Sequence, residues 1–258
     1  MIRAAVKIAY LGEHFSGSQI QPGFRTVEGD VLSDLRTITK MREEDIDLKL
    51  ASRTDRGVNS LGNVAVFYSS IDDPDTLLRA LNAVSKDIFY RGIAVVDEEF
   101  NPRFAELRRY RYAISAVRMD VSAIRECAGL FIGEHDFTRF CRPEGRSATI
   151  TLNSVDVHEE GGMVFLDFSA RYFLWNMIRR IVAAIASVGR GDSSLSDVKD
   201  ALDGKDITFG IARPDALTLM DVSYGGVEFT APPAGAFEKR AEEELLKNKL
   251  MNIFLTTL

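Results

Sequence analysis

The loop of residues 52–58 holds the residues whose types and spacing could most clearly do chemistry. It reads Ser-Arg-Thr-Asp-Arg-Gly-Val, so the carboxylate of Asp55 stands between Arg53 and Arg56. Guanidinium groups nearby favour the charged form of a carboxylate. An ionised aspartate on a loop between rigid strands can act as a nucleophile or a base. Asp55 is therefore a candidate catalytic residue, and a turn closed by Gly57 with its arginines in solvent is the structural alternative.

A second candidate is the run Arg-Arg-Tyr-Arg-Tyr at residues 108–112. On a strand, Tyr110 and Tyr112 share one face. Arg109 and Arg111 then share the other face. Aromatic rings beside guanidinium groups suit an RNA base that stacks on a ring while its phosphate is held nearby. The alternative is a half-buried strand whose tyrosines belong to the core.

A third candidate is the pair Arg179 and Arg180, which interrupts the apolar run of residues 172–188. A helix that is apolar nearly all round is a buried helix. A buried arginine without a counter-charge costs several kcal/mol, so a carboxylate partner is expected. The candidate partners are Asp55, Asp136 and Asp167.

The elements that must position these residues follow the order β-α-β-β-α-β, and a similar order recurs. The first set comprises strands at 3–10, 47–51, 61–68 and 93–96, with helices from a Thr26 cap to 35 and at 75–82. The second comprises strands at 109–115, 149–157, 163–170 and 217–224, with helices at 121–130, 172–188 and 195–202. Two such split units predict an α+β fold, with ferredoxin-like or RRM-like antiparallel sheets on either side of a central RNA-binding cleft. The expected domains are residues 1–100, which carry the Asp55 loop, and residues 101–258.

The end of the chain predicts a further helix at residues 237–255, after the breaker Ala-Pro-Pro-Ala-Gly at 231–235. Its apolar stripe is expected at Phe237, Ala241, Leu245, Leu250 and Phe254. We expect this stripe to dock on its own domain, with a partner chain as the alternative.

Composition excludes several classes of protein. The chain has 258 residues, 46% of them apolar, and a net charge of −6, which argues against a generally basic nucleic-acid coat. Residues 101–190 nevertheless contain 13 arginines, no lysine and 10 acidic residues, so local phosphate binding is possible. Cys127 and Cys141 lack metal-ligand spacing, which favours a reducing cytoplasm. No membrane-spanning stretch and no metal or nucleotide cofactor motif is indicated.

Together, the three candidate features resemble the tRNA pseudouridine synthase A family. The family loop G/S-R-T-D-x-G-V-H is matched by residues 52–59, and its basic tyrosine strand by residues 108–112, preceded by Phe-Asn-Pro-Arg-Phe at 100–104. The aromatic-led helix with M-x-R-x-I/V is matched by residues 177–182. The resemblance covers about residues 8 to 224 and is closer to archaeal members. Three positions depart from the family pattern, at points where RNA contacts are expected: Ser18, Arg56 and Asn59.

The resemblance implies the isomerisation of uridine in the anticodon arm of tRNA, near nucleotides 38 to 40, without a cofactor. Asp55 matches the aspartate that attacks the substrate, so that the base detaches from C1′, rotates and rejoins through C5. Tyr110 matches the tyrosine that stacks on the flipped base, Arg179 the arginine that holds the aspartate, and Arg53 an arginine near the displaced nucleotide. The further substrate-binding candidates are Arg56, Arg109, Arg111, Tyr112 and Arg180. The family is typically homodimeric, with tRNA lying across both subunits.

Two other functions are compatible with parts of the pattern. A non-catalytic RNA-binding protein of two RRM-like sheets would use the same tyrosines and arginines but would not need Asp55. A hydrolase with Asp55 as nucleophile usually needs a second carboxylate, and the three candidate features contain none.

Overall fold

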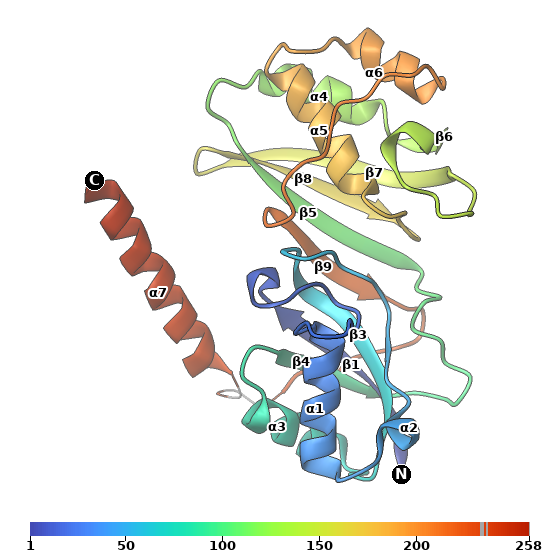
Figure 1. Cartoon of the computed structure of the whole chain (residues 1–258), viewed down its shortest axis with the longest axis vertical. Coiled ribbons are helices and arrows are strands. Elements are labelled where there is room, and N and C mark those ends of the chain that lie inside the picture. Colours follow the sequence, from blue (N-terminus) through green and yellow to red (C-terminus); the bar gives the residue numbers. More distant parts are fainter. Residues whose placement is uncertain (233–234, 236, 258) are drawn as a thin grey trace.

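In the computed structural model, which describes residues 1–232, 235 and 237–257, the strands join into one sheet (Figure 1). The strands are β1 (Ile2–Tyr10), β2 (Lys49–Leu50), β3 (Asn59–Ser69), β4 (Phe89–Val95), β5 (Leu107–Ser115), β6 (Gly133–Asp136), β7 (Thr149–Glu160), β8 (Met163–Ala170) and β9 (Leu217–Ser223). The helices are α1 (Val27–Thr39), α2 (Glu43–Ile46), α3 (Pro74–Val84), α4 (Val121–Gly129), α5 (Met177–Gly189), α6 (Leu195–Leu202) and α7 (Glu238–Thr257).

The mixed α+β class is confirmed, but the expectation of two separate sheets was wrong. The order is β4-β1-β3-β9-β5-β8-β7-β6, with β2 beside β3. The late strand β9 joins the two halves, because it runs parallel to β3 at Asn59 and Ser60 and antiparallel to β5. A strand that pairs on both sides removes two open sheet edges, which would otherwise expose unpaired backbone groups. The division at residues 100 and 101 stays a prediction.

Two hydrophobic clusters hold helices against this sheet. In the first half, Val6 and Ile8 of β1 pack with Val31 and Leu35 of α1. Helix α1 begins at the predicted cap, where the Thr26 side chain accepts a hydrogen bond from the backbone of Gly29. In the second half, α4 and α5 pack on β5, β7 and β8 through a larger cluster. Figure 1 shows the two groups of helices at opposite ends of the sheet, with β9 between them.

Helix α5 is shorter than predicted, because it begins at Met177 and not at residue 172. The residue before it, Asn176, has the left-handed φ of 61° and ends the irregular segment of residues 171–176. This segment pairs with a distant loop, where the Arg142 N–H donates to the Trp175 carbonyl at 2.9 Å. The irregular backbone brings the side chain of Trp175 to the candidate site.

The expected docking of the terminal helix through an apolar stripe was wrong for Leu245, Leu250 and Phe254, whereas the first residue of that stripe, Phe237, does pack on its own chain. Figure 1 shows α7 projecting away from the sheet, and Leu245, Leu250 and Phe254 are 54%, 57% and 60% exposed. Its start is anchored instead by Arg240, which donates to the carbonyls of residues 85, 86 and 88. Phe237 packs edge-on against Phe89, with ring centroids 5.8 Å apart.

Candidate active site

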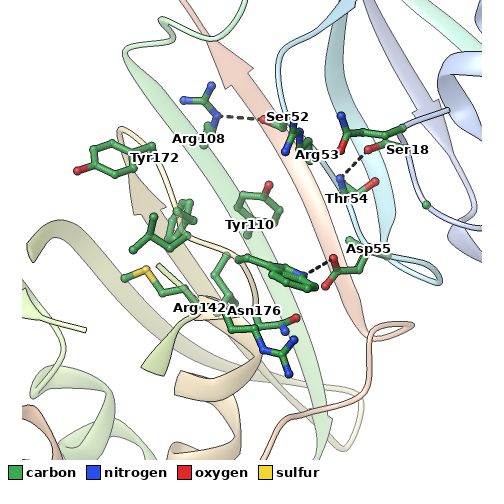
Figure 2. Close-up of a pocket in the computed structure, with 18 of the residues that line it drawn as sticks. Ser18, Ser52, Arg53, Thr54, Asp55, Arg108, Tyr110, Arg142, Tyr172 and Asn176 are labelled. Atoms are coloured by element: carbon green, nitrogen blue, oxygen red, sulfur yellow. Dashed lines mark hydrogen bonds between the residues drawn. The ribbon is translucent and has the colours of Figure 1, made fainter. Parts of the chain in front are cut away.

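A pocket of about 950 Å³ lies where the two halves of the sheet meet. Its walls come from the loop of residues 50–58, the start of β5, the loop of residues 142–147 and the segment of residues 171–179. Figure 2 shows Asp55 on the loop side of this pocket and Tyr110 on the β5 side. The pocket therefore gathers members of all three features that the sequence singled out.

Both carboxylate oxygens of Asp55 accept hydrogen bonds in this pocket. Arg179 donates through Nη1 to Oδ2 at 3.0 Å, and Trp175 donates through Nε1 to Oδ1 at 3.1 Å. The sequence left three possible partners for the buried arginine, and the structure selects Asp55. The other two are engaged elsewhere, since Asp136 bonds Thr138 and Asp167 pairs with Arg111.

Arg179 is fixed at both ends of its guanidinium group. Its Nε donates to the carbonyl of Ala212 at 2.8 Å, and Nη1 also reaches Oδ1 of Asn176 at 3.3 Å. Its side chain is 15% exposed, against 33% for Asp55. A charge-assisted hydrogen bond from so constrained a donor fixes the orientation of the carboxylate.

Buried hydrogen bonds brace the loop that carries Asp55. The backbone N–H of Thr54 donates to the Ser18 hydroxyl at 2.8 Å, and the Ser18 N–H donates to the Thr54 carbonyl at 3.0 Å. The side chains of Tyr10 and Thr54 share a further bond at 2.8 Å. The loop then turns at Gly57, whose φ of +84° is left-handed and where a Cβ would lie 3.1 Å from the Pro214 ring.

The guanidinium that contacts Asp55 does not come from its neighbours in the sequence. Arg53 and Arg56 are exposed and line the pocket, and within the described ranges neither forms an ion pair with Asp55. The positive charge beside the carboxylate comes from Arg179, which lies 124 residues away in the chain. The two loop arginines are left free to contact a ligand that enters the pocket.

Tyr110 lies in the pocket but is only 7% exposed. Its ring packs edge-on against Phe173, with centroids 5.2 Å apart, and burial raises its pKa. The adjacent Arg108 also lines the pocket, and it donates to the Ser52 hydroxyl at 3.0 Å and to the Ala51 carbonyl at 3.2 Å. Arg108 thus ties the tyrosine strand to the Asp55 loop.

The structure does not bring four of the predicted substrate-binding residues to this pocket. Arg109 lies on the other face of β5, where it pairs with Asp221 at 3.4 Å. Arg111 donates two hydrogen bonds to the Asp167 carboxylate, at 2.7 and 2.8 Å. The Tyr112 hydroxyl donates to the Arg213 carbonyl. Arg180 lies outside the pocket lining, and its buried Nε has no hydrogen-bond partner in the described part of the chain. Their role in substrate binding stays a prediction.

Sequence reasoning missed several residues that line the pocket. Trp175 contacts Asp55 directly, and the guanidinium of Arg142 lies 4.9 Å from the centre of its ring. Four arginines form a basic rim, and all of them belong to the arginine-rich block of residues 101–190: Arg103, Arg142, Arg146 and Arg171. That block, free of lysine, was the signal that could have located them.

Two positions that depart from the family pattern brace the loop. Ser18 lines the pocket but is only 1% exposed and bonds Thr54. The expected RNA contact at this position stays a prediction. The Asn59 side chain accepts from the Gly12 N–H at 2.8 Å and donates to the Asp215 carbonyl at 2.9 Å. It thereby ties the Asp55 loop to the segments on either side of it.

Neither a metal centre nor a membrane span is found in the described residues. They contain no group of three or more His, Cys, Asp or Glu side chains that could hold an ion. None of the helices in those ranges is long and apolar enough to cross a membrane. Cys127 and Cys141 are free, and burial raises the pKa of their thiols to about 12 and about 11.

Comparison with known proteins shows the family of the chain. A family model described as tRNA pseudouridine synthase matches residues 127–225. The tRNA pseudouridine synthase A of Pyrococcus abyssi is 37% identical over 259 residues, which cover 98% of this chain and 97% of that protein. The protein of the same name from Thermococcus sibiricus is 39% identical, with 95% and 92% covered. The chain belongs to the tRNA pseudouridine synthase A family. It is a tRNA pseudouridine synthase, an isomerase, and these relatives are archaeal, as the sequence predicted.

The similarity to solved structures is weaker than the similarity in sequence. The archaeal box H/ACA Nop10–Cbf5 complex matches 71% of the synthase and 43% of that chain, with a TM-score of 0.36 and 11% identity. The family model covers Arg179 but not the Asp55 loop, whereas the archaeal relatives extend over both parts of the site.

Proposed function

We propose that this synthase isomerises uridines of the tRNA anticodon arm, about positions 38 to 40, with Asp55 as the nucleophile. The observation that supports this most is the Asp55 carboxylate in the pocket, bonded to Arg179 at 3.0 Å. A carboxylate that a fixed guanidinium holds in one orientation can be aimed at a substrate atom, as a nucleophile must be. The anticodon arm follows from the family resemblance, and the charge of the pocket rim is compatible with it.

The proposed reaction balances without a cofactor. The bond between C1′ and N1 of uridine breaks, the uracil turns, and a bond between C1′ and C5 forms. The proton on C5 leaves to solvent and N1 gains a proton, so the product has the same atoms as the substrate. Asp55 either attacks C1′ or first removes a proton from the sugar, and in both cases it is regenerated.

The pocket suits a nucleotide that is no longer stacked on its neighbours in the RNA. Displacing a base from its stack costs a few kcal/mol, which contacts with the protein must offset. Tyr110 supplies an aromatic ring on one side, and Arg53 lies exposed beside Asp55. The basic rim of Arg103, Arg142, Arg146 and Arg171 gives a chain of net charge −6 a local site for phosphates.

Tritium release tests the chemistry itself. A tRNA transcript labelled at uracil C5 is incubated with the wild type and with Asp55→Asn, and tritium in water is counted. We expect release by the wild type alone, while filter binding shows that both proteins hold the tRNA. Release by Asp55→Asn at the wild-type rate would contradict the role of Asp55. Binding without release by either protein would favour the RNA-binding alternative.

The same experiment locates the target. Transcripts in which single uridines of the anticodon arm are replaced by cytidine should lose release only when the target is changed. If release is lost instead on replacing uridines outside the arm, the proposed position is wrong.

We propose further that the synthase is a cytoplasmic homodimer that binds one tRNA across both subunits. Light scattering of the purified protein should then give twice the 28.7 kDa mass of the chain. A monomer mass at concentrations that support full activity would contradict this.

A further inference from the structure

We propose that Trp175 is a positioning residue that occupies Asp55 in the free protein and releases it when the target nucleotide enters. The proposal rests on the proposed function of Asp55 as nucleophile. Trp175 is the single tryptophan of the chain, and its indole N–H donates to Asp55 Oδ1 at 3.1 Å. In Figure 2 a dashed line marks this bond.

The two oxygens of Asp55 are held by partners of different solvent exposure. Oδ2 is bonded by Arg179, whose side chain is 15% exposed and whose Nε is anchored on the Ala212 carbonyl. Oδ1 is bonded by Trp175, which is 42% exposed. A hydrogen bond to an exposed partner exchanges with water or a ligand at low net cost. Oδ1 is therefore the oxygen that substrate can free for reaction.

The setting of Trp175 lets the ring move while its backbone stays in place. The backbone is held by the bond from the Arg142 N–H to the Trp175 carbonyl at 2.9 Å. The ring is covered on one side by the Arg142 guanidinium, 4.9 Å from its centre. Arg142 is itself exposed at the pocket rim, so an RNA phosphate that binds this guanidinium competes with its contact to the ring. Binding of the RNA backbone thereby loosens the indole from Asp55.

Occupation of Asp55 lowers the apparent affinity for substrate, because only the released fraction of the protein is competent. Trp175→Phe keeps an aromatic ring and removes the N–H. We expect this variant to lower KM by about three- to tenfold, the range of a weak hydrogen bond, with kcat unchanged. A lower kcat with unchanged KM would overturn the proposal, because it would mean that the indole holds Asp55 during the reaction. A thermal melt close to that of the wild type shows that the variant is folded.

The fluorescence of Trp175 reports on its hydrogen bond to Asp55, since the chain has no other tryptophan. Two variants serve as a matched pair, because Asp55→Asn keeps an oxygen acceptor while Asp55→Ala removes it. We expect their emission spectra to differ in the free proteins and to coincide when both are saturated with a tRNA transcript. A difference that persists in the complexes overturns the release of Trp175. Identical spectra of the free proteins overturn the contact itself.

The experiments separate this proposal from the proposed function. If Asp55→Asn still releases tritium, the nucleophile assignment fails, whatever the spectra show. If Asp55→Asn is inactive and the spectra still differ in the complexes, Asp55 keeps its role and only the release of Trp175 fails.

Discussion

The ion pair of Asp55 and Arg179 joins two residues that are 124 positions apart, one in the loop between β2 and β3 and the other on helix α5. Arg179 donates to Asp55, Asn176 and the Ala212 carbonyl, so its guanidinium holds the carboxylate in position. Loss of this one side chain leaves three acceptors without their donor. Effects on activity and on stability should therefore appear together.

We expect Arg179→Ala to lower kcat by a factor of 100 or more and the free energy of unfolding by about 1–3 kcal/mol. The first figure is typical of losing one preorganised electrostatic donor, and the second of losing hydrogen bonds to a charged group. Tritium release and urea unfolding measure the two effects. Arg190→Ala, directly after the same helix, is the control. Among the described residues Arg190 forms an ion pair only with exposed Asp192, so its loss should change stability by less than about 0.5 kcal/mol. Equal behaviour of the two variants would contradict the assigned role.

Tyr110 packs in the core of the structure, and its stacking on the target base is a proposal. Its variants can separate the two. Tyr110→Phe keeps the ring and should keep kcat/KM within a few-fold of the wild type. Tyr110→Ala should lower kcat/KM by about 5- to 150-fold, because stacking of one base is worth about 1–3 kcal/mol, and it should also destabilise the core. Phe168→Ala is the control for destabilisation alone, since Phe168 is 1% exposed and lies outside the pocket lining. If Phe168→Ala lowers activity as much as Tyr110→Ala at a temperature where both are folded, stacking on Tyr110 is not needed.

At the scale of elements, the site depends on the turn that ends the Asp55 loop. Gly57 combines a φ of +84° with the Pro214 ring, 3.1 Å from the place of a Cβ. Gly12 lies against the same turn, where a Cβ would meet the Val58 carbonyl oxygen at 2.4 Å. The turn is thus packed between two segments that are far apart in the sequence, and a small change there moves Asp55.

We expect Gly57→Ala to destabilise the protein by about 1–2 kcal/mol and to lower kcat about tenfold or more, through backbone strain and a shifted loop. The control is Gly161→Ala in the turn between β7 and β8, where φ is +57° and no atom lies within 4 Å of a Cβ. Gly161→Ala introduces the backbone strain without the steric contact, so it should keep the wild-type kcat. Single-turnover kinetics and thermal melts compare the two. A normal kcat for Gly57→Ala would show that the loop tolerates movement.

The sequence predicted the elements better than their pairing. The Thr26 cap could be predicted because it depends on local hydrogen bonding. The pairing of a buried arginine with a carboxylate could be predicted because it depends on burial. The position of β9 in the sheet could not be predicted, because the side-chain pattern of a strand does not show which other strand it pairs with. The bond from Trp175 to Asp55 was hidden for another reason: residues 172–176 continue the apolar run of α5 and resemble one more helical turn.

The same limit applies to α7. Five positions at near-helical spacing predicted an apolar stripe, but the apolar residues of this helix do not gather on one face that meets the sheet. They lie exposed on neighbouring positions: Leu245, Leu246, Leu250, Met251, Phe254 and Leu255. An apolar stripe predicts a buried helix face only when the other positions of the helix are polar. In α7 several of those other positions are also apolar.

At the scale of the whole molecule, most of α7 adds little to the stability of the fold. A chain that ends at Lys247 keeps the Arg240 anchor. The large apolar residues that it loses from the described part of the helix are each more than half exposed: Leu250, Met251, Ile253, Phe254 and Leu255. We expect its melting temperature to stay within about 2 °C of the full chain, because little apolar surface is lost from the core. Calorimetry of both chains measures this. A fall of 5 °C or more would show that the distal helix is packed in solution.

The protein should lose stability in alkaline solution. Burial raises the pKa of five tyrosines: Tyr10, Tyr90, Tyr110, Tyr112 and Tyr224. Above about pH 10 the unfolded chain loses these protons while the folded chain keeps them, so each tyrosine lowers the free energy of unfolding by up to about 1.4 kcal/mol per pH unit. Below pH 10 both states are protonated and the effect vanishes. Urea unfolding at pH 9 and pH 11 tests this, and equal free energies would contradict it.

The place of β9 in the sheet has a consequence for synthesis on the ribosome. Its partner β3 ends at Ser69, but β9 begins at Leu217, and its pairing at Asn59 and Ser60 adjoins the Asp55 loop. Translation at about 5–20 residues per second separates the two strands by roughly 7–30 s. During that interval the nascent first half has an open edge beside its unfinished active site. Pausing of translation before β9 should therefore lower the yield of active enzyme, even though every residue of the final protein is unchanged.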